Sequence, residues 1–175
     1  MVGGHYIGPY TGSAGVTLEL LLEDLVSHIH LNDSSPPIYA FWNSVLHQPD
    51  GGIAQTGTWN MDARFPRNEL VRRIELIASR RDAVTLRNCD AEAFILGYIP
   101  GLPSETLVYC DPPYFAKSNR LYLDHYQRSD HARVEEVIQR DLPRRWVVSY
   151  DSAPEISTYY SGRRAFTYRL QYSAS

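Results

Sequence analysis

The sequence predicts an α/β fold in which helices cover both faces of an open, mostly parallel sheet. Short apolar runs with the length of buried strands alternate with longer segments of helical periodicity. Strand, turn and helix repeat in this order along 175 residues, which is typical of a single α/β domain. The hydrophobic share of 43% is sufficient for a globular core and excludes a wholly disordered chain.

Before residue 48 the pattern predicts two strands and two helices. A strand over residues 5–8 leads through a glycine-rich turn into a leucine-rich helix over residues 16–26. A second strand covers residues 27–31. The helix over residues 36–46 begins at Pro36 or Pro37, because proline is tolerated in a first helical turn. Residues 48–60 are polar and rich in glycine and are predicted to form a loop.

The rest of the chain continues the alternation of helix and strand. Apolar residues recur at helical spacing between residues 67 and 80, and Asp130 is a candidate N-cap for a later helix. The last strand is predicted because its residues alternate in polarity. Helices are expected over residues 67–80, 91–96, 130–140 and 154–160, and strands over residues 83–86, 106–110, 146–150 and 164–172.

Several classes of protein are disfavoured by composition. No apolar run approaches the roughly 20 residues of a membrane span, and residues 1–5 do not resemble a signal peptide. Cys89 and Cys110 flank apolar runs, so we expect reduced, buried thiols and a cytoplasmic protein. Two distant cysteines and histidines without ligand spacing do not predict a metal site.

The basic residues are almost all arginine. The net charge is -3, and among 17 basic residues Lys117 is the one lysine. Arginine is the better partner for phosphates and base edges, so local contacts with DNA are compatible with this composition. A solvated helix face explains any single arginine pair equally simply. The pairs are Arg72-Arg73, Arg80-Arg81, Arg144-Arg145 and Arg163-Arg164.

Small or acidic residues follow four predicted strands. These positions are the turn over residues 8–15, Asp33, Asp90 and Asp111. Ligands of open α/β sheets bind beyond the carboxyl ends of the strands, so a shared nucleotide-like ligand is predicted there. The turn has neither a dinucleotide-binding nor a Walker pattern. Local alternatives remain open, because Asp33 can form an Asx-turn and Asp90 can cap the helix that follows it.

Residues 111–114, Asp-Pro-Pro-Tyr, form the most informative motif. The Asp111 carboxylate and the Pro112 carbonyl can each accept a hydrogen bond from one amino group, leaving the nitrogen lone pair free. Tyr114 offers a flat face on which a base can stack. An enzyme that methylates the amino group of a base taken out of the helix has these needs. In isolation, the motif is also compatible with a stiff turn.

The chain resembles the D12 class of adenine-N6 DNA methyltransferases, the family of the DNA adenine methylases. The resemblance rests on five segments that occur in the family's order along nearly the whole chain. They are residues 6–16, residues 30–33, residues 58–65, the Asp-Pro-Pro-Tyr motif and residues 146–151. The implied fold is the Rossmann-like fold of S-adenosylmethionine-dependent methyltransferases.

The resemblance also implies a cofactor, a substrate and site residues. S-adenosylmethionine is expected to contact the turn after the first strand, with Asp33 on its ribose and Asp90 on its adenine ring. A flipped adenine of double-stranded DNA is expected against Tyr114, with its amino group on Asp111 and the Pro112 carbonyl, and no covalent enzyme intermediate. The expected cofactor-binding residues are Pro9, Tyr10, Gly12, Ser13, Asp33 and Asp90, and the expected catalytic residues are Asp111, Pro112, Pro113 and Tyr114.

Some features depart from the family pattern. Gly8 replaces an acidic residue, few residues precede the first strand, and the DNA-recognition segment is reduced to about residues 48–67. We therefore expect a shortened, monomeric member from a bacterial or phage-infected cell, in a phage or restriction-modification setting, with weakened hold on cofactor and DNA. The alternatives are an inactive DNA-binding fragment, a methyltransferase for RNA or protein glutamine, and an NAD-binding domain, which the glycine pattern disfavours.

Overall fold

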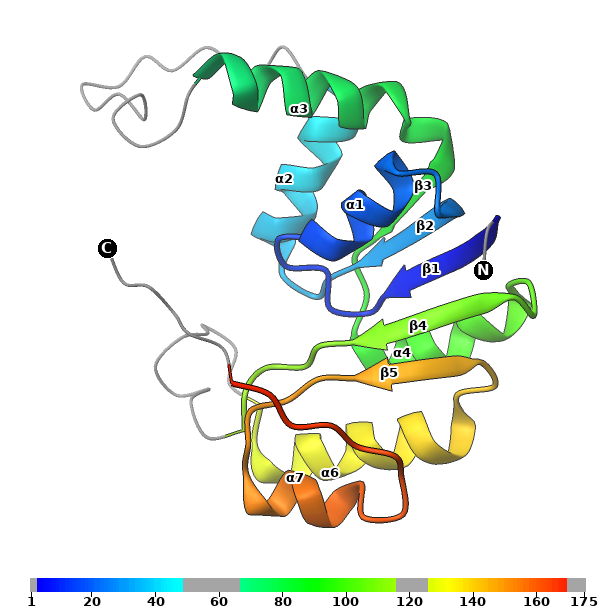
Figure 1. Ribbon diagram of the computed structural model, residues 1–175, viewed down its shortest axis with the longest axis vertical. Helices are drawn as coiled ribbons and strands as arrows, with labels where there is room; N and C mark the ends of the chain where they lie inside the picture. Colours follow the sequence, from blue (N-terminus) through cyan, green and yellow to red (C-terminus); the bar gives the residue numbers. More distant parts are fainter. Residues whose placement is uncertain (1–2, 49–66, 116–125, 170–175) are drawn as a thin grey trace.

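The computed structural model describes residues 3–48, 67–115 and 126–169. Their centre is a five-stranded sheet in the order β3-β2-β1-β4-β5, and every neighbouring pair is parallel. Figure 1 shows the strands side by side with their arrowheads toward the same edge. The strands are β1 (Gly4–Gly8), β2 (Val26–Asn32), β3 (Val84–Arg87), β4 (Thr106–Cys110) and β5 (Arg145–Val148).

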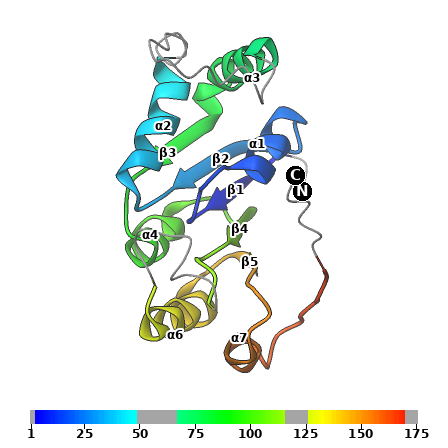
Figure 2. The same ribbon diagram turned by 90° about the vertical axis from the view of Figure 1, so that its left-hand side faces the viewer.

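Helices connect consecutive strands and cover both faces of the sheet (Figures 1 and 2). Each parallel pair needs such a crossover, because the chain must return to the starting edge before the next strand begins. Short 3₁₀ turns precede β3 and follow α4, and a π-helical turn, η5 (Val137–Asp141), extends α6. The α-helices are α1 (Gly15–Leu22), α2 (Pro36–His47), α3 (Arg67–Ser79), α4 (Ala91–Gly97), α6 (Arg128–Glu136) and α7 (Pro154–Tyr159).

Alternation along the strands divides the core into two main clusters. In β1, Tyr6 packs with α1 and α2, whereas its neighbour Ile7 packs with α4, α6 and η5. In β4, Leu107 joins the first cluster and Val108 the second. Successive side chains of a strand point to opposite faces, so a sheet buried on both sides needs apolar residues at adjacent positions. The predicted fold class is therefore confirmed.

Three predictions about single elements are wrong: the end of the first helix, the N-cap of α6 and the last strand. The first helix ends at Leu22 instead of residue 26, because Asp24 takes a left-handed conformation and turns the chain into β2. Asp130 is not an N-cap: the helix begins earlier, Gln127 is its N-cap, and Asp130 accepts from the Gln127 N–H in a capping box. The described part of the predicted last strand, residues 164–169, forms no strand and is exposed. The predicted loop lies almost entirely outside the described residues.

Three histidines meet on the face of the sheet that carries α4. The Nδ1 of His5 in β1 lies 3.0 Å from the Nε2 of His30 in β2, and the rings of His28 and His30 are 4.6 Å apart. His28 bonds Thr85 of β3, and His30 bonds the Tyr98 hydroxyl. The Arg87 guanidinium lies over the Tyr98 ring. Within the described ranges, no group of three or more histidine, cysteine or acidic residues is arranged to hold a metal ion.

This cluster makes stability sensitive to acid. Burial, followed by the neighbouring His28 and His5 and by Arg87, lowers the pKa of His30 from 6.5 to about 3. Between these values the unfolded chain binds more protons than the folded one. We therefore expect the free energy of unfolding to fall as the pH drops through this interval, by at most about 1.4 kcal/mol per pH unit from this residue.

Urea unfolding from about pH 7.5 to about pH 4.5 measures this slope. The variant His30→Gln removes the titrating group and should flatten the slope. The variant His47→Gln, at an exposed position in the last turn of α2, should leave the slope as it is in the unchanged protein. Equal slopes for His30→Gln and the unchanged protein would show that the cluster does not control acid stability.

Candidate active site

The sheet order places a switch point between β1 and β4. From β1 the chain passes to β2 and β3 on one side, and then returns to β4 on the other side. Helices that leave in opposite directions open a crevice at the carboxyl ends of these two central strands. The turn after Gly8 and the Asp-Pro-Pro-Tyr segment after Cys110 both begin at this edge. The structure therefore brings together the two motifs that sequence analysis singled out.

Two side chains, of Asp33 and Trp42, hold the turn after β1 at Gly12. Gly12 has a positive φ of 46°, and a Cβ there would meet no atom within 4 Å, so the turn is open on this side. The Gly12 N–H donates to Asp33 Oδ2 at 3.0 Å, and the Trp42 indole N–H of α2 donates to the Gly12 carbonyl at 3.0 Å. Pro9 is buried, whereas Gly12 and Ser13 are exposed. A fixed backbone with exposed residues can contact a ligand closely.

Asn32, the last residue of β2, connects the ends of three neighbouring strands. Its side-chain amide donates to the Pro9 carbonyl after β1 and to the Cys89 carbonyl after β3, both at 3.0 Å. Its side-chain oxygen accepts from the Cys89 N–H, also at 3.0 Å. The Asn32 side chain is fully buried, so its own polar atoms depend on these backbone groups instead of water. Asn32 thereby fixes the spacing between the candidate cofactor loops.

Asp33 and Asp90 occupy the predicted strand ends and also have local structural roles. Asp33 Oδ1 accepts from the Ser35 N–H in an Asx-turn, while its Oδ2 holds Gly12. Asp90 is the N-cap of α4, where its Oδ1 accepts from the N–H groups of Glu92 and Ala93. Asp90 is exposed and Asp33 is half-buried, so both carboxylates remain accessible for additional hydrogen bonds.

Asp111 directly follows β4 and is exposed at the switch point, while Pro112 is buried beneath it. The Ser149 hydroxyl, one residue beyond β5, donates to Asp111 Oδ1. Pro113 and Tyr114 are half-buried. The motif therefore presents a carboxylate at the edge of the sheet and continues into a partly covered segment.

A second contact from the β5 side holds the end of this segment. The Phe115 N–H donates to Asp151 Oδ1 at 2.7 Å. Residues Ser149 and Asp151 thus fix the two ends of the Asp-Pro-Pro-Tyr-Phe stretch.

Tyr10, in the turn after β1, contacts the aromatic side chain of Tyr126. The Tyr126 hydroxyl donates to the Tyr10 hydroxyl at 3.2 Å, and the two rings meet edge to face. Burial raises the pKa of Tyr126, and the nearby carboxylates of Asp90, Asp130 and Asp33 raise it further. Tyr126 therefore stays a neutral donor. Tyr10, a predicted cofactor-binding residue, is half-buried and packs against the second core cluster.

The cysteine of β4 is unsuited to nucleophilic attack. Cys110 is fully buried, and desolvation, followed by the charge of Asp111, raises the pKa of its thiol to about 12. A thiol that remains protonated is a poor nucleophile. The other described groups of the candidate site are hydrogen-bond acceptors and aromatic faces, which can position a substrate by non-covalent contacts.

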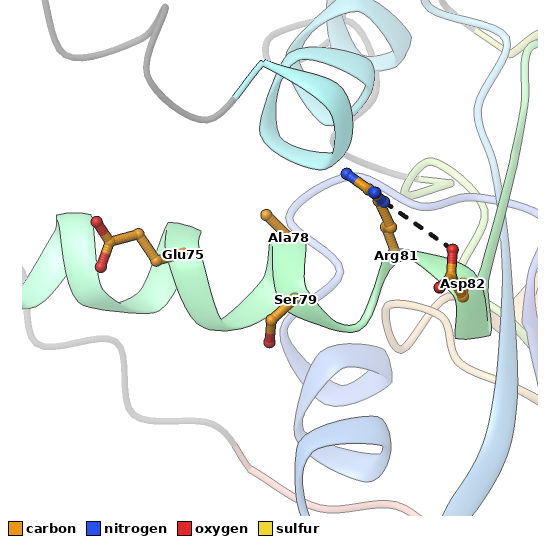
Figure 3. A pocket seen from close by; sticks show the side chains of 5 residues that line it. All are labelled: Glu75, Ala78, Ser79, Arg81 and Asp82. Carbon is orange, nitrogen blue, oxygen red and sulfur yellow. Dashed lines mark ion pairs between the residues drawn. The ribbon is translucent and has the colours of Figure 1, made fainter.

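A shallow hollow elsewhere on the molecule lies away from this site (Figure 3). Its lining comes from the end of α3 and the turn that leads into β3, at the amino end of that strand. The switch point is at the opposite edge of the sheet. The lining residues are Glu75, Ala78, Ser79, Arg81 and Asp82.

Comparison with known families identifies the chain. A family model described as D12 class N6 adenine-specific DNA methyltransferase matches residues 58–173, more than half of the sequence. The chain belongs to this family. The D12 methyltransferase match includes Asp90 and the whole Asp-Pro-Pro-Tyr segment, and the parallel sheet is the Rossmann-like methyltransferase fold expected from the sequence.

Other comparisons are more distant. Among solved structures, this D12 methyltransferase is similar to a conserved hypothetical protein from Streptococcus pyogenes, with 16% identity and a TM-score of 0.44. The alignment covers 86% of this chain and 69% of that chain. A search of curated proteins finds no match. Across the described residues, no helix is long and apolar enough to cross a membrane.

Sequence reasoning missed the residues that support the site. Asn32, Ser149 and Asp151 lie in segments that carried the family resemblance, but they received no role of their own. Each is a polar residue at or just beyond the end of an apolar strand, which was the available signal. Trp42 gave no such signal, because its contact with Gly12 depends on how α2 crosses the sheet.

Proposed function

We propose that this protein transfers a methyl group from S-adenosylmethionine to the N6 amino group of adenine at specific sites in DNA. The observation that carries the proposal is the meeting of two loops at one switch point. The turn after β1, held by Asp33 and Trp42, lies beside the Asp111 carboxylate after β4. Membership of the D12 family indicates adenine in DNA as the substrate.

The described residues suit the proposed cofactor. The open backbone at Gly12 and Ser13 allows close approach of the methionine part, and an accessible carboxylate on Asp33 can bind ribose hydroxyls. Asp90 uses Oδ1 for its helix cap, and among the described residues its Oδ2 makes no hydrogen bond and can accept from an adenine amino group. When bound, S-adenosylmethionine supplies an electrophilic methyl group on a sulfonium sulfur.

The residues after β4 would orient the target base. Asp111 and the Pro112 carbonyl accept the two amino hydrogens, and Tyr114 stacks on the ring, so the nitrogen lone pair faces the incoming methyl group. Positive charge develops on that nitrogen during attack, and the Asp111 carboxylate stabilises it. Positioning by Pro113 and the buried Pro112 limits the motion of this acceptor pair.

The DNA partner follows from this chemistry. An amino group inside a duplex is not accessible to the Asp111 acceptor pair, so we propose that the adenine is flipped out of double-stranded DNA. We propose that a monomer carries out this reaction in the cytoplasm, with residues 48–67 contacting the recognition sequence. A phage or restriction-modification system is the proposed setting.

Transfer of a labelled methyl group from S-adenosylmethionine tests the function. We expect label in N6-methyladenine of duplex DNA, and none in RNA or in protein glutamine. Isothermal titration with the cofactor, run in parallel, measures whether the chain holds it despite Gly8. Label in RNA or protein would overturn the choice of substrate. DNA binding without transfer, and without cofactor binding, would instead identify an inactive DNA-binding member.

A further inference from the structure

The carboxylate of Asp111 has a hydroxyl partner on the neighbouring strand. In the β4–β5 pair Cys110 aligns with Val148, so the next residues, Asp111 and Ser149, leave the sheet beside each other. The Ser149 N–H donates to the Cys110 carbonyl at 3.0 Å and fixes the Ser149 backbone. From this position the Ser149 hydroxyl donates to Asp111 Oδ1. The contact is thus formed by the register of the sheet and not by a loop.

A second hydroxyl determines the direction of the hydrogen bonds. The Tyr109 hydroxyl lies 2.9 Å from Ser149 Oγ. A carboxylate only accepts, so the single Ser149 hydrogen is directed to Asp111, and Tyr109 must donate to Ser149. Burial raises the pKa of Tyr109, and the nearby charge of Asp111 also raises it, so Tyr109 keeps its hydrogen at neutral pH. The result is a chain of donors from Tyr109 through Ser149 to Asp111.

We infer that Ser149, supported by Tyr109, is the positioning residue that orients the Asp111 carboxylate for the target amino group; this inference rests on the proposed function. With Oδ1 held by Ser149, rotation of the carboxylate is restricted, and Oδ2 is the oxygen presented to the substrate. Tyr109 is itself fixed, because its ring stacks against Tyr6 at 6.4 Å and it packs on the core. The orientation of Asp111 is therefore set by the core of the protein.

Methyl transfer by two substitutions of Ser149 tests the inference. Ser149→Ala removes the donor, and we expect kcat to fall by roughly 10- to 100-fold. Loss of a hydrogen bond to a charged group costs a free energy that corresponds to about this factor. The KM values for cofactor and DNA should stay within about twofold, since Ser149 contacts neither. Ser149→Thr keeps the hydroxyl and should restore most of kcat. Tyr109→Phe should cause a smaller loss of kcat.

A matched control separates this effect from general loss of a serine. Ser157 is an exposed serine of α7 whose hydroxyl bonds the Ala153 carbonyl at 3.4 Å, and Ser157→Ala should leave kcat unchanged. An unchanged kcat in Ser149→Ala, or a change confined to KM, would overturn the inference. A Ser149→Thr variant as slow as Ser149→Ala would also count against an orienting hydroxyl.

Crystal structures test the positioning role of Ser149 even if the unchanged protein does not methylate DNA. Absence of transfer by the unchanged protein would refute the proposed function and not the positioning role. In that case the Asp111 side chain should take another rotamer, or several, in crystals of Ser149→Ala, and keep its rotamer in crystals of Ser157→Ala. An Asp111 carboxylate that stays in place without the Ser149 hydroxyl would overturn the inference.

Discussion

Replacing Asp111 with alanine is expected to abolish detectable methyl transfer while leaving cofactor binding largely intact. Asp111 is exposed at the switch point, where it would accept a hydrogen bond from the target amino group and stabilise the charge that develops on it. Loss of such a group costs about a hundredfold or more in kcat. Cofactor binding is expected to persist, because the candidate cofactor loops are held by Asn32 and Asp33 on the other side of β1. Labelled transfer and isothermal titration measure the two properties separately.

Two further variants sharpen this experiment. Asp111→Asn keeps one acceptor oxygen and removes the charge, so its rate should lie between those of Asp111→Ala and the unchanged protein. Asp141→Ala removes an acidic residue at the end of η5 that pairs with Arg140, remote from the switch point, and should transfer at the normal rate. If Asp111→Ala still methylates adenine, the assigned role is wrong. If it fails to bind cofactor, Asp111 belongs to the cofactor site.

Replacing Asn32 is expected to weaken both the fold and cofactor binding. Asn32→Ala leaves the buried Pro9 carbonyl and both partly buried backbone groups of Cys89 without their partner. We expect the free energy of unfolding to fall by about 2–4 kcal/mol, and the dissociation constant for S-adenosylmethionine to rise at least about tenfold. Asn32→Asp should be worse, because its carboxylate faces two carbonyl oxygens and cannot donate to them.

Urea unfolding and isothermal titration of the same preparations measure these effects. Titration must be done at a temperature at which unfolding curves show the variants to be folded, so that weak binding reports on the loops. Asn68→Ala on the exposed surface of α3 is the matched control, with a change in stability within about 0.5 kcal/mol. Normal cofactor affinity in folded Asn32→Ala would show that the spacing of the loops does not depend on this residue.

The sheet could be predicted because its signal is local, whereas several element ends depend on distant contacts. Apolar runs identified all five described strands, and the strand over residues 106–110 is confirmed to the residue. The end of α1 could not be predicted in this way. Arg80, from after α3, donates to the Leu21 carbonyl and to Asp24 at the turn where the helix stops. The alternating polarity of residues 164–169 wrongly predicted a strand, because these residues have no strand partner among the described residues.

Some residues of the candidate site could likewise be predicted from local sequence, whereas the roles of others depend on distant contacts. The rule that ligands bind at the carboxyl ends of strands singled out Asp33, Asp90 and Asp111 as candidate site residues from sequence alone. The local roles of Asp33 and Asp90 were also foreseeable, since an Asx-turn and a helix cap involve near neighbours. The roles of Asn32 and Ser149 depend on which strands become neighbours. Such pairings follow from the sheet order, which the spacing of residues along the chain does not encode directly.

Because Trp42 donates a hydrogen bond to Gly12, the fluorescence of Trp42 can report on the turn after β1. Indole emission depends on the polarity and hydrogen bonding of the ring, and the buried Trp42 donates to the carbonyl of the turn that would contact the cofactor. The chain has three tryptophans, so replacing Trp59 and Trp146 with phenylalanine would leave Trp42 as a single emitter. Stopped-flow mixing with S-adenosylmethionine would then follow the turn in real time, without an added dye.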